Sequence, residues 1–413
     1  MTYLFNNSKI RSKINIVVSR KLPSAMTLSD FRSGMGKCFR PFLKRYRKVY
    51  PFWIILSCTI KKYPYNIIIG NNILNHLGKY IRKLSIGPDA YVITNAFIKK
   101  EYGKLLNKAL KKPGFTVRFK IVPDSEKSKS IGVATSIIKD ITLYDKKRRI
   151  FIIAFGGGVI GDLAGFIASI YKRGVPYIQV PTTLLAQVDS SIGGKTAVDL
   201  NQGKNLVGAF YQPRLVFSDV SILRTLDVRQ IQSALAEVIK YGIIKDAQFF
   251  AYLEKNYSDI LALKVPALAF IVMRCSRIKA KIVQQDEREE KGIRTILNFG
   301  HTIGHAIEAA LRYRGYNHGE AVALGMLVAS DISKNLNLIN NVTAKRIENL
   351  IDAVGLPTKI EKISLADIIK IHYHDKKFMG LENKFVLIKG IGKAKVVKNI
   401  PLKIIRQALE RRI

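Results

Sequence analysis

The sequence predicts an α/β domain with a mostly parallel sheet, followed by a mainly helical domain. Between residues 57 and 227, short apolar runs alternate with amphipathic stretches, as in sheets covered by helices. One of these runs ends in a glycine-rich turn that leads into a helical stretch, which is typical of Rossmann-like folds. After about residue 228, apolar residues recur mainly at helical spacing. We therefore expect domains at 57–227 and 228–413.

The expected elements follow from these patterns. Strands are predicted at 65–69, 90–94, 116–121, 149–154, 177–180 and 215–219, with helices at 72–84, 97–111, 127–145 and 159–171. In the second domain, helices are predicted at 228–254, 262–284, 297–313, 319–336, 341–354 and 364–371, with a small hairpin near 384–388 and 395–397. The apolar segment from Phe52 to Ile60 is too short to span a bilayer, and we expect a buried strand there.

Composition excludes several classes of protein. Of the 413 residues, 48% are hydrophobic, which is typical of a folded globular chain. The three cysteines have no paired spacing, so we do not expect a disulfide framework. We expect a reducing compartment. The formal net charge is +39, but the basic residues are spread along the whole chain, whereas a nucleic-acid footprint clusters. We expect neither a nucleic-acid nor a membrane partner.

Residues 1–56 differ from the rest because they are basic and contain one acid, Asp30. This composition is found in organelle transit peptides, and equally in extensions that lie outside a fold. The segment lacks the apolar region of a secretory signal. We expect a poorly ordered extension and a cytoplasmic protein, with organelle targeting as the alternative.

Two polar turns follow neighbouring predicted strands of the first domain. Gly156–Asp162 joins a strand to a helix, so its backbone could approach a pyrophosphate at the helix N-terminus. Thr182 and Thr183 follow the next strand and would emerge at the same edge of the sheet, where open α/β folds bind ligands. Together the turns favour a nucleotide site.

A third turn carries a lysine. Gly193-Gly194-Lys195 resembles the end of a P-loop, but the first glycine of that motif is missing at the required distance. We expect a flexible loop that presents Lys195, with Lys204 and Asn205 about ten residues later, to an anionic oxygen.

A histidine-rich segment in the second domain predicts a metal site. His301 and His305 are four residues apart on a predicted helix and share a face, and His318 follows. Upstream, Glu237 lies in an otherwise apolar helix. Two histidines and a glutamate form a recurrent catalytic zinc set that keeps one position open. Spacing does not decide which two histidines bind.

Two polar residues precede the histidines. Arg294 and Asn298 are also four residues apart, so on a helix they would share its inner face.

Eight motifs occur in a fixed order, namely GGGVIGD, PTTLLAQVDSSIGGKT, GKN, AEVIKYG, DERE, LNFGHTIGHAIE, HGEAVALGM and DKK. From about residue 60 onward the chain therefore resembles 3-dehydroquinate synthase, a family of the sugar phosphate cyclase superfamily. The resemblance implies a lyase of the shikimate pathway, which supplies aromatic amino acids. Its substrate is a phosphorylated keto-acid sugar, 3-deoxy-D-arabino-heptulosonate 7-phosphate, which becomes 3-dehydroquinate and phosphate. The implied steps are transient NAD-dependent oxidation, phosphate elimination, reduction and intramolecular aldol closure.

The resemblance also implies two cofactors, NAD and a divalent cation (Zn²⁺ or Co²⁺), and a homodimer. The implied metal ligands are Glu237, His301 and His318. The implied NAD-binding residues are Asn95, Asp124, Glu126, Lys129, Gly156, Gly157, Gly158, Val159, Ile160, Gly161, Asp162, Thr182, Thr183, Lys195, Lys204, Ile222, Leu223, Arg224 and Thr225. The implied substrate-binding residues are Asp189, Lys195, Asn205, Lys240, Lys279, Glu289, Arg294, Asn298 and His305, with Lys376 or Lys377 near the phosphate.

Arg173 resembles a residue that the family donates across its dimer interface. The segment between the DERE motif and Arg294 is one residue longer than expected, and the separation from Lys279 favours Glu289 over Glu290 as the substrate-binding acid.

Three other functions compete with this interpretation. A different sugar phosphate cyclase, such as a 2-deoxy-scyllo-inosose synthase, uses a substrate without a carboxylate, so Arg294 and Lys279 argue against it. A metal-dependent alcohol dehydrogenase of the glycerol dehydrogenase type would not need so many phosphate-binding cations. A nucleic-acid-binding protein is suggested only by the charge, and it leaves Glu237, His301 and His318 unexplained.

Overall fold

The computed structural model describes residues 16–19, 52–58, 64–145, 150–311, 315–361, 363–377 and 383–413. The side chains of 16–19, 52–55, 57 and 372–377 are not described either. The expected disorder of residues 1–56 falls mostly outside this part of the chain. The side chains of Lys376 and Lys377 are among those not described, so the choice between them as a phosphate contact stays a prediction.

The chain forms two compact units. The first contains the described residues up to Thr225 together with Leu268–Arg288, and the second contains Leu226–Ala267 and Glu289–Ile413. Most of the long helix α9 (Val265–Gln285) therefore belongs to the first unit.

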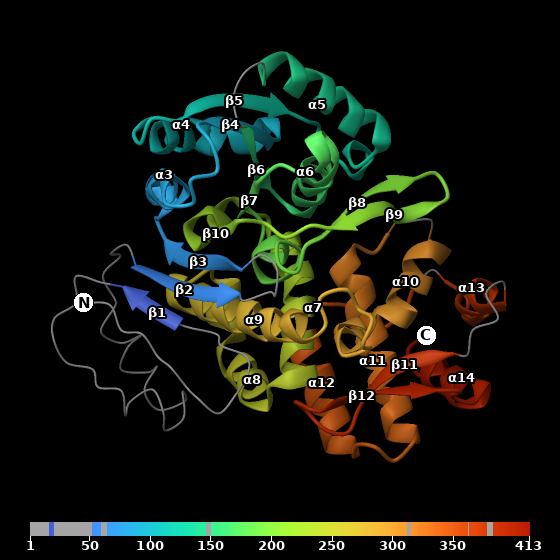
Figure 1. Ribbon diagram of the computed structural model, residues 1–413. Coiled ribbons are helices and arrows are strands. Elements are labelled where there is room, and N and C mark those ends of the chain that lie inside the picture. Colours follow the sequence, from blue (N-terminus) through green and yellow to red (C-terminus); the bar gives the residue numbers. More distant parts are fainter. Residues whose placement is uncertain are drawn as a thin grey trace, which may run out of the picture. The chain divides into compact units, whose positions relative to one another are not determined.

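The first unit is built on an eight-stranded sheet with the order β1-β2-β3-β10-β7-β6-β4-β5 (Figure 1). The six strands from β3 to β5 run parallel, and β2 and β1 extend the sheet antiparallel at one edge. The strands are β1 (Ile16–Ser19), β2 (Phe52–Cys58), β3 (Tyr65–Asn71), β4 (Asp89–Thr94), β5 (Thr116–Ile121), β6 (Ile150–Gly156), β7 (Tyr177–Pro181) and β10 (Leu215–Asp219). The six predicted parallel strands and the strand after Phe52 are confirmed.

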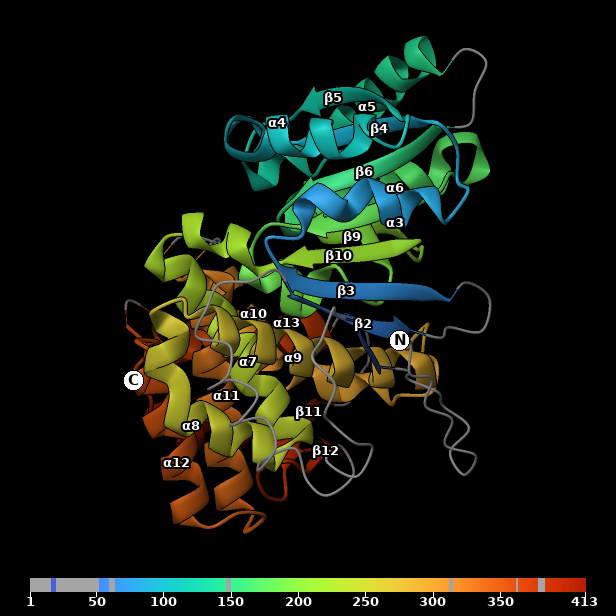
Figure 2. The same cartoon turned by 90° about the vertical axis from the view of Figure 1, so that its left-hand side faces the viewer.

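Helices cover both faces of this sheet. Helices α3 (Leu77–Arg82) and α4 (Ala96–Lys111) pack on one face, and Figure 2 looks onto them. Helices α5 (Ile131–Tyr144) and α6 (Gly158–Ile170) pack on the other. Every residue of β6 is buried, which explains why its sequence is a continuous apolar run. Short helical turns η1 (Leu74–His76), η2 (Glu126–Ser128), η3 (Tyr171–Arg173) and η5 (Val220–Thr225) join these elements.

The prediction of a flexible loop around Lys195 is wrong. Lys195–Leu200 (β8) and Gly203–Phe210 (β9) form an antiparallel hairpin in which Lys195 pairs with Phe210. Lys195 lies at the open end of the hairpin, while Lys204 and Asn205 lie beside its turn. The cross-strand hydrogen bonds fix both segments, although glycines and lysines hide the strand pattern in the sequence.

The second unit is mainly helical, as predicted. Its helices are α7 (Val228–Lys245), α8 (Ala247–Leu261), α10 (His301–Ala310), α11 (His318–Asn335), α12 (Asn341–Ala353), α13 (Leu365–Lys377) and α14 (Leu402–Glu410). Strands β11 (Lys384–Ile388) and β12 (Ala394–Lys398) form the predicted hairpin. Asp246 ends α7 and caps α8, so the single helix predicted at 228–254 is two. Helix α14 was not predicted. Among the described residues, no helix is both long and apolar enough to cross a membrane.

The helix predicted at 297–313 begins later than expected. Arg294–Asn298 forms a 3-10 turn, η6, and Gly300 has a φ of 82° that only glycine adopts easily. Helix α10 then begins at His301. In a 3-10 turn, residues four apart do not share a face. The expectation that Arg294 and Asn298 do so is therefore wrong, since Arg294 is buried and Asn298 is exposed.

Candidate functional site

The second unit contains a buried carboxylate on α7. Glu237 is 1% exposed, and neither of its oxygens has a hydrogen-bond partner of regular geometry within the described residues. The ammonium group of Lys240, one turn further along α7, forms an ion pair with Oε2. Because a buried ionised carboxylate is costly without compensating charge, the structure around it must supply cations.

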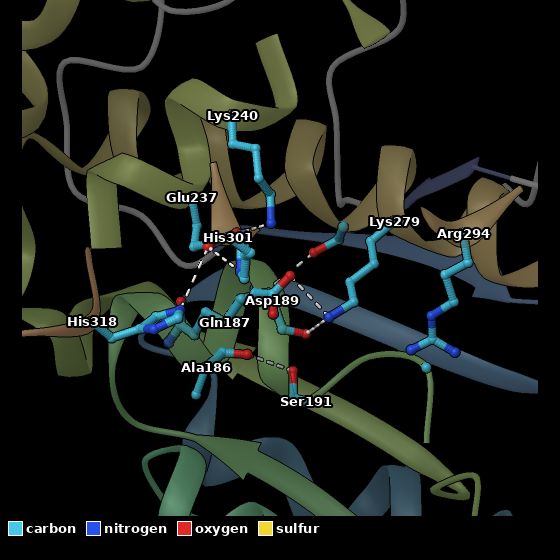
Figure 3. A network of polar contacts seen from close by, with 12 residues as sticks. Ala186, Gln187, Asp189, Ser191, Glu237, Lys240, Lys279, Arg294, His301 and His318 are labelled. Atoms are coloured by element: carbon cyan, nitrogen blue, oxygen red, sulfur yellow. Dashed lines mark hydrogen bonds and ion pairs between the residues drawn. The ribbon is translucent and has the colours of Figure 1, made fainter. Parts of the chain in front are cut away.

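Two histidines approach the other oxygen of Glu237 (Figure 3). The Nε2 atom of His301 lies 3.4 Å from Oε1, and that of His318 lies 3.7 Å from it. One ligand atom from each of the three side chains lies within 4.8 Å of the others. This arrangement matches the two-histidine, one-glutamate set of catalytic metal centres.

Close packing of α10 against α11 brings the two histidines together. Each histidine is the first residue of its helix. A Cβ atom added to Gly325 of α11 would lie 1.9 Å from the carbonyl oxygen of Gly300, and one added to Gly304 of α10 would lie 3.1 Å from that of Ala321. The helices therefore touch through their backbones, which a side chain at Gly325 would prevent.

The electrostatics of the cluster suit a cation. Burial alone would raise the pKa of Glu237, but Lys240 and the two histidines hold the pKa well below its usual value. Burial and the nearby charge of Lys240 lower the pKa of His301 to about 3, so this ring is neutral and keeps a lone pair for a metal. Burial opposes charge on His318 too, but contacts with Glu237 and Glu308 raise its pKa to about 9, so a metal that binds this ring must displace a proton from it.

The backbone at His318 is clamped. Asn317 and Glu320 form a capping box at the start of α11. Arg229 of α7 binds both oxygens of Glu320 at 2.7 and 2.8 Å, and the backbone N–H of Gly319 donates to Ser233 Oγ at 3.1 Å. This clamp was not predicted, although the spacing Asn-x-x-Glu before an apolar run is a signal for a capping box.

Glu308 is a second residue for which no role was predicted. It is 8% exposed, and its Oε1 atom lies 3.5 Å from His318 Nδ1. His305, Glu308 and His318 also bring ligand atoms within 4.8 Å of one another. The signal was present in the sequence, because Glu308 lies seven residues after His301 on the same face of α10.

The other predicted substrate-binding residues of this unit lie on η6, on α10 and in the segment that precedes η6. Arg294 is 2% exposed, and its Nε atom lies 3.3 Å from Glu289 Oε1. Glu290 is exposed, so the acid paired with Arg294 is Glu289. His305 and Asn298 are exposed.

In the first unit, the Gly156–Asp162 turn connects β6 to α6. Gly157 is the N-cap of α6 and supplies no side chain to cap the helix. A Cβ atom on Gly157 would approach Thr183 to 3.1 Å, and one on Gly158 would approach Ser190 to 3.2 Å. No side chain therefore caps the N-terminus of α6 at Gly157, and uncapped helix N-termini of this kind can accept a phosphate. Thr182 is buried beside the turn, where its backbone N–H donates to Gly156 O.

A buried lysine links this turn to the hairpin. Lys129 is 5% exposed, and its Nζ atom lies 2.7 Å from Asp162 Oδ2 and also donates to the side chain of Asn205. Asn205 has a φ of 59°, and Asp199 Oδ1 holds its backbone N–H at 2.7 Å. Burial raises the pKa of Asp162 to about 6, although Lys129 opposes the shift.

A second buried lysine of this unit, Lys279, lies on α9. Its Nζ atom contacts both the carbonyl oxygen and Oδ1 of Asp189 at 2.9 Å (Figure 3). Asp189 lies in η4 (Ala186–Ser190), a π-helical turn, and such turns are frequent at functional sites. The structure therefore brings these two predicted substrate-binding residues together.

The remaining predicted residues of this unit lie at turns. Asn95 is buried and caps α4 by accepting from Ile98 N at 2.8 Å. Asp124 and Glu126 are exposed after β5, and Ile222, Leu223, Arg224 and Thr225 lie on η5. Arg173 is exposed in a turn where Lys172, Arg173 and Gly174 all have positive φ.

Solved structures share this fold. A 2-deoxy-scyllo-inosose synthase complexed with carbaglucose-6-phosphate, NAD⁺ and Co²⁺ is 27% identical, with a TM-score of 0.78 over 87% of this chain and all of the other. An iron-containing alcohol dehydrogenase at 15% identity has a TM-score of 0.61 over 84% of this chain and 98% of that one, which shows similarity of fold alone. Fold and side-chain cluster together place the chain in the structural class of the sugar phosphate cyclases.

Sequence comparison then selects the family. The family models for the N-terminal and C-terminal parts of 3-dehydroquinate synthase match residues 119–233 and 234–378. The 3-dehydroquinate synthase of Desulforamulus reducens is 46% identical over 81% of this chain and 94% of its own length. That of Thermoanaerobacter pseudethanolicus is 44% identical over 83% and 96%. The chain belongs to the 3-dehydroquinate synthase family.

Proposed function

We propose that this protein is a 3-dehydroquinate synthase, a lyase that converts 3-deoxy-D-arabino-heptulosonate 7-phosphate to 3-dehydroquinate and phosphate. The convergence of Glu237, His301 and His318 carries the proposal, together with family membership along more than four fifths of the chain. Relatives with this activity are 44–46% identical, whereas the 2-deoxy-scyllo-inosose synthase structure is 27% identical. The reaction begins and ends at the same oxidation level, so NAD would act catalytically.

The residues of the second unit fit a divalent cation. A buried carboxylate without regular hydrogen bonds and a neutral His301 are the donors that Zn²⁺ or Co²⁺ prefers. A bound cation would polarise a substrate hydroxyl as a Lewis acid, and NAD would take up a hydride and return it. Glu237, His301 and His318 would hold the cation, and Lys240 keeps the Glu237 carboxylate ionised.

The glycine-rich turn at the start of α6 fits the pyrophosphate of a dinucleotide. We assign the pyrophosphate to the amide groups of Gly157 and Gly158 at the start of α6, with Thr182 and Thr183 beside them. The other NAD-binding residues implied by the family resemblance keep that assignment as part of this proposal.

The substrate anions are assigned to cationic and neutral polar side chains, as the family resemblance implies. Arg294 and Lys279 take the carboxylate, because a guanidinium suits a planar anion and both side chains already hold an acid in place. Lys195, Asn205, Asn298 and His305 take the phosphate. The departing phosphate can itself accept the proton, so the chain need not supply a separate base.

Phosphate release tests the reaction directly. With 3-deoxy-D-arabino-heptulosonate 7-phosphate, Zn²⁺ and NAD⁺ far below the substrate concentration, we expect many turnovers per NAD⁺, abolished by a chelator. His301→Ala should lose metal and activity together. Release from glucose 6-phosphate, with none from the seven-carbon substrate, would instead make the protein a 2-deoxy-scyllo-inosose synthase.

Replacement of Lys129 tests the nucleotide site. Lys129→Met removes a charged hydrogen-bonding group shared by Asp162 and Asn205. We expect NAD⁺ to bind about 10–150-fold more weakly, because loss of one charged hydrogen bond costs about 1.5–3 kcal/mol. Calorimetric titration measures this change. The control is the Zn²⁺ affinity of the variant, which should not change. Unchanged NAD⁺ affinity would show that Lys129 does not contribute to the nucleotide site.

Two further properties belong to the proposal. The protein is a cytoplasmic homodimer, and Arg173 contributes to the site of the partner subunit. Its exposure and its position in a turn with three consecutive positive φ values support a role at an interface. Light scattering on the full chain measures the mass of the assembly.

A further inference from the structure

The imidazole ring of His318 lies between two carboxylates. Its Nε2 atom faces Glu237 Oε1 at 3.7 Å, and its Nδ1 atom faces Glu308 Oε1 at 3.5 Å. Glu308 lies near the end of α10 and is 8% exposed, whereas long acidic side chains are rarely buried unless they are paired. A cation held by Glu237 would therefore bind the Nε2 side of the ring, and Glu308 would occupy the other side.

The other proposed histidine ligand is oriented differently. His301 places Nδ1 3.2 Å from the carbonyl oxygen of Phe299, a neutral acceptor close by in the chain. The orientation of the His301 ring is thus set by its own local backbone. His318 depends instead on a charged side chain from another helix.

The backbone clamp at His318 fixes the main chain but not the protonation of the imidazole ring. The capping box of Asn317 and Glu320 and the contact of Gly319 with Ser233 fix the main chain. They do not determine which ring nitrogen carries the proton. A carboxylate that accepts from Nδ1–H selects the tautomer with a lone pair on Nε2 and strengthens that nitrogen as a ligand.

We propose that Glu308 is a positioning residue for the metal site, which holds His318 with Nε2 directed at the cation through a hydrogen bond from Nδ1–H. This inference rests on the metal site of the proposed function. It assigns a role to a residue that does not itself contact the cation.

The competing arrangement is a second cation bound by His305, Glu308 and His318. That site would need the Nδ1 lone pair of His318 while the first site needs Nε2, so both could be filled only if the ring lost both protons. A neutral ring serves one site. We assign the cation to the first site, because both oxygens of the buried Glu237 carboxylate lack regular hydrogen bonds, and Glu308 would then accept the Nδ1 proton.

The test compares metal binding by three variants of the full-length protein. Glu308→Ala removes the acceptor, and Glu308→Gln keeps an acceptor oxygen but removes the charge. Glu254→Gln is the matched control, because this substitution removes the same charge in the same unit. Glu254 pairs with Arg346 and does not face a histidine. Zn²⁺ affinity is measured by competition with a chelator, and the Co²⁺ derivative by its visible absorption spectrum.

We expect Glu308→Ala to bind Zn²⁺ about 10–100-fold more weakly, the usual loss when the partner of a metal-bound histidine is removed. Glu308→Gln should lose less, with a shifted Co²⁺ spectrum, and Glu254→Gln should match the wild type. A purely structural role would lower the melting temperature of the metal-free variants and leave Zn²⁺ affinity unchanged. That result would overturn the proposal.

A stoichiometry of two cations per chain, reduced to one in Glu308→Gln, would also overturn it and make Glu308 a ligand. These readouts do not depend on turnover. If the wild type binds one Zn²⁺ but releases no phosphate, the proposed function fails while the role of Glu308 remains under test.

Discussion

Glu237→Gln is expected to abolish metal binding and catalysis and to destabilise the protein before any metal is added. The substitution removes one of three proposed ligands, so Zn²⁺ affinity should fall by more than the roughly 100-fold caused by loss of an indirect contact. It also leaves Lys240, which is 2% exposed, without its ion-pair partner. Breaking one side of a buried pair costs about 3–5 kcal/mol. Denaturant unfolding of the metal-free protein measures this loss.

A double substitution separates the two effects. Lys240→Met combined with Glu237→Gln removes both buried charges, so we expect most of the lost stability to return, because a neutral pair needs no charge compensation. Metal binding should not return. Wild-type Zn²⁺ affinity in Glu237→Gln would show that Glu237 is not a ligand. A double variant no more stable than Glu237→Gln would show that the ion pair is not what stabilises α7.

Much of the first unit could be predicted, because a parallel sheet covered on both faces requires strands that are apolar throughout. The run from Ile150 to Gly156 meets this requirement, and its burial is complete. The hairpin of β8 and β9 was missed because β9 is largely exposed and contains two glycines, so its sequence has little alternation. Its register depends on cross-strand hydrogen bonds that no local pattern reports.

The metal cluster could be predicted only in part. The spacing of His301 and His305 places them on one face of a helix, but helical spacing cannot choose between His305 and His318. The choice is made by packing between helices, which places His301 and His318 beside Glu237 and leaves His305 exposed. Likewise, helical spacing did not reveal that Arg294–Asn298 forms a 3-10 turn, which ends at Phe299, or that α10 begins only after Gly300, whose φ is 82°.

The contact between α10 and α11 leads to the second large expected effect. A Cβ atom at position 325 would lie 1.9 Å from Gly300 O and 2.8 Å from Gly304 N, far inside any real contact. In Gly325→Ala the two helices must therefore separate by about 1 Å. Overpacking of this kind typically costs about 1–3 kcal/mol, and more when backbone atoms must move. Thermal unfolding with and without Zn²⁺ measures the cost.

The same displacement should impair the metal site although no ligand is changed. His301 and His318 begin the two helices that would be separated, and metal sites tolerate errors of only about 0.2 Å in ligand distance. We expect Zn²⁺ affinity to fall along with stability.

Gly132→Ala is the matched control, because Gly132 lies in α5 with nothing within 4 Å of the added Cβ atom, and a compatible alanine gains about 0.4–1 kcal/mol. If Gly325→Ala kept wild-type stability and Zn²⁺ affinity, backbone contact between these helices would not be what sets the separation of the two histidines. If it lost both while Gly132→Ala lost neither, the close approach of two glycines would be as necessary to the site as the ligands themselves.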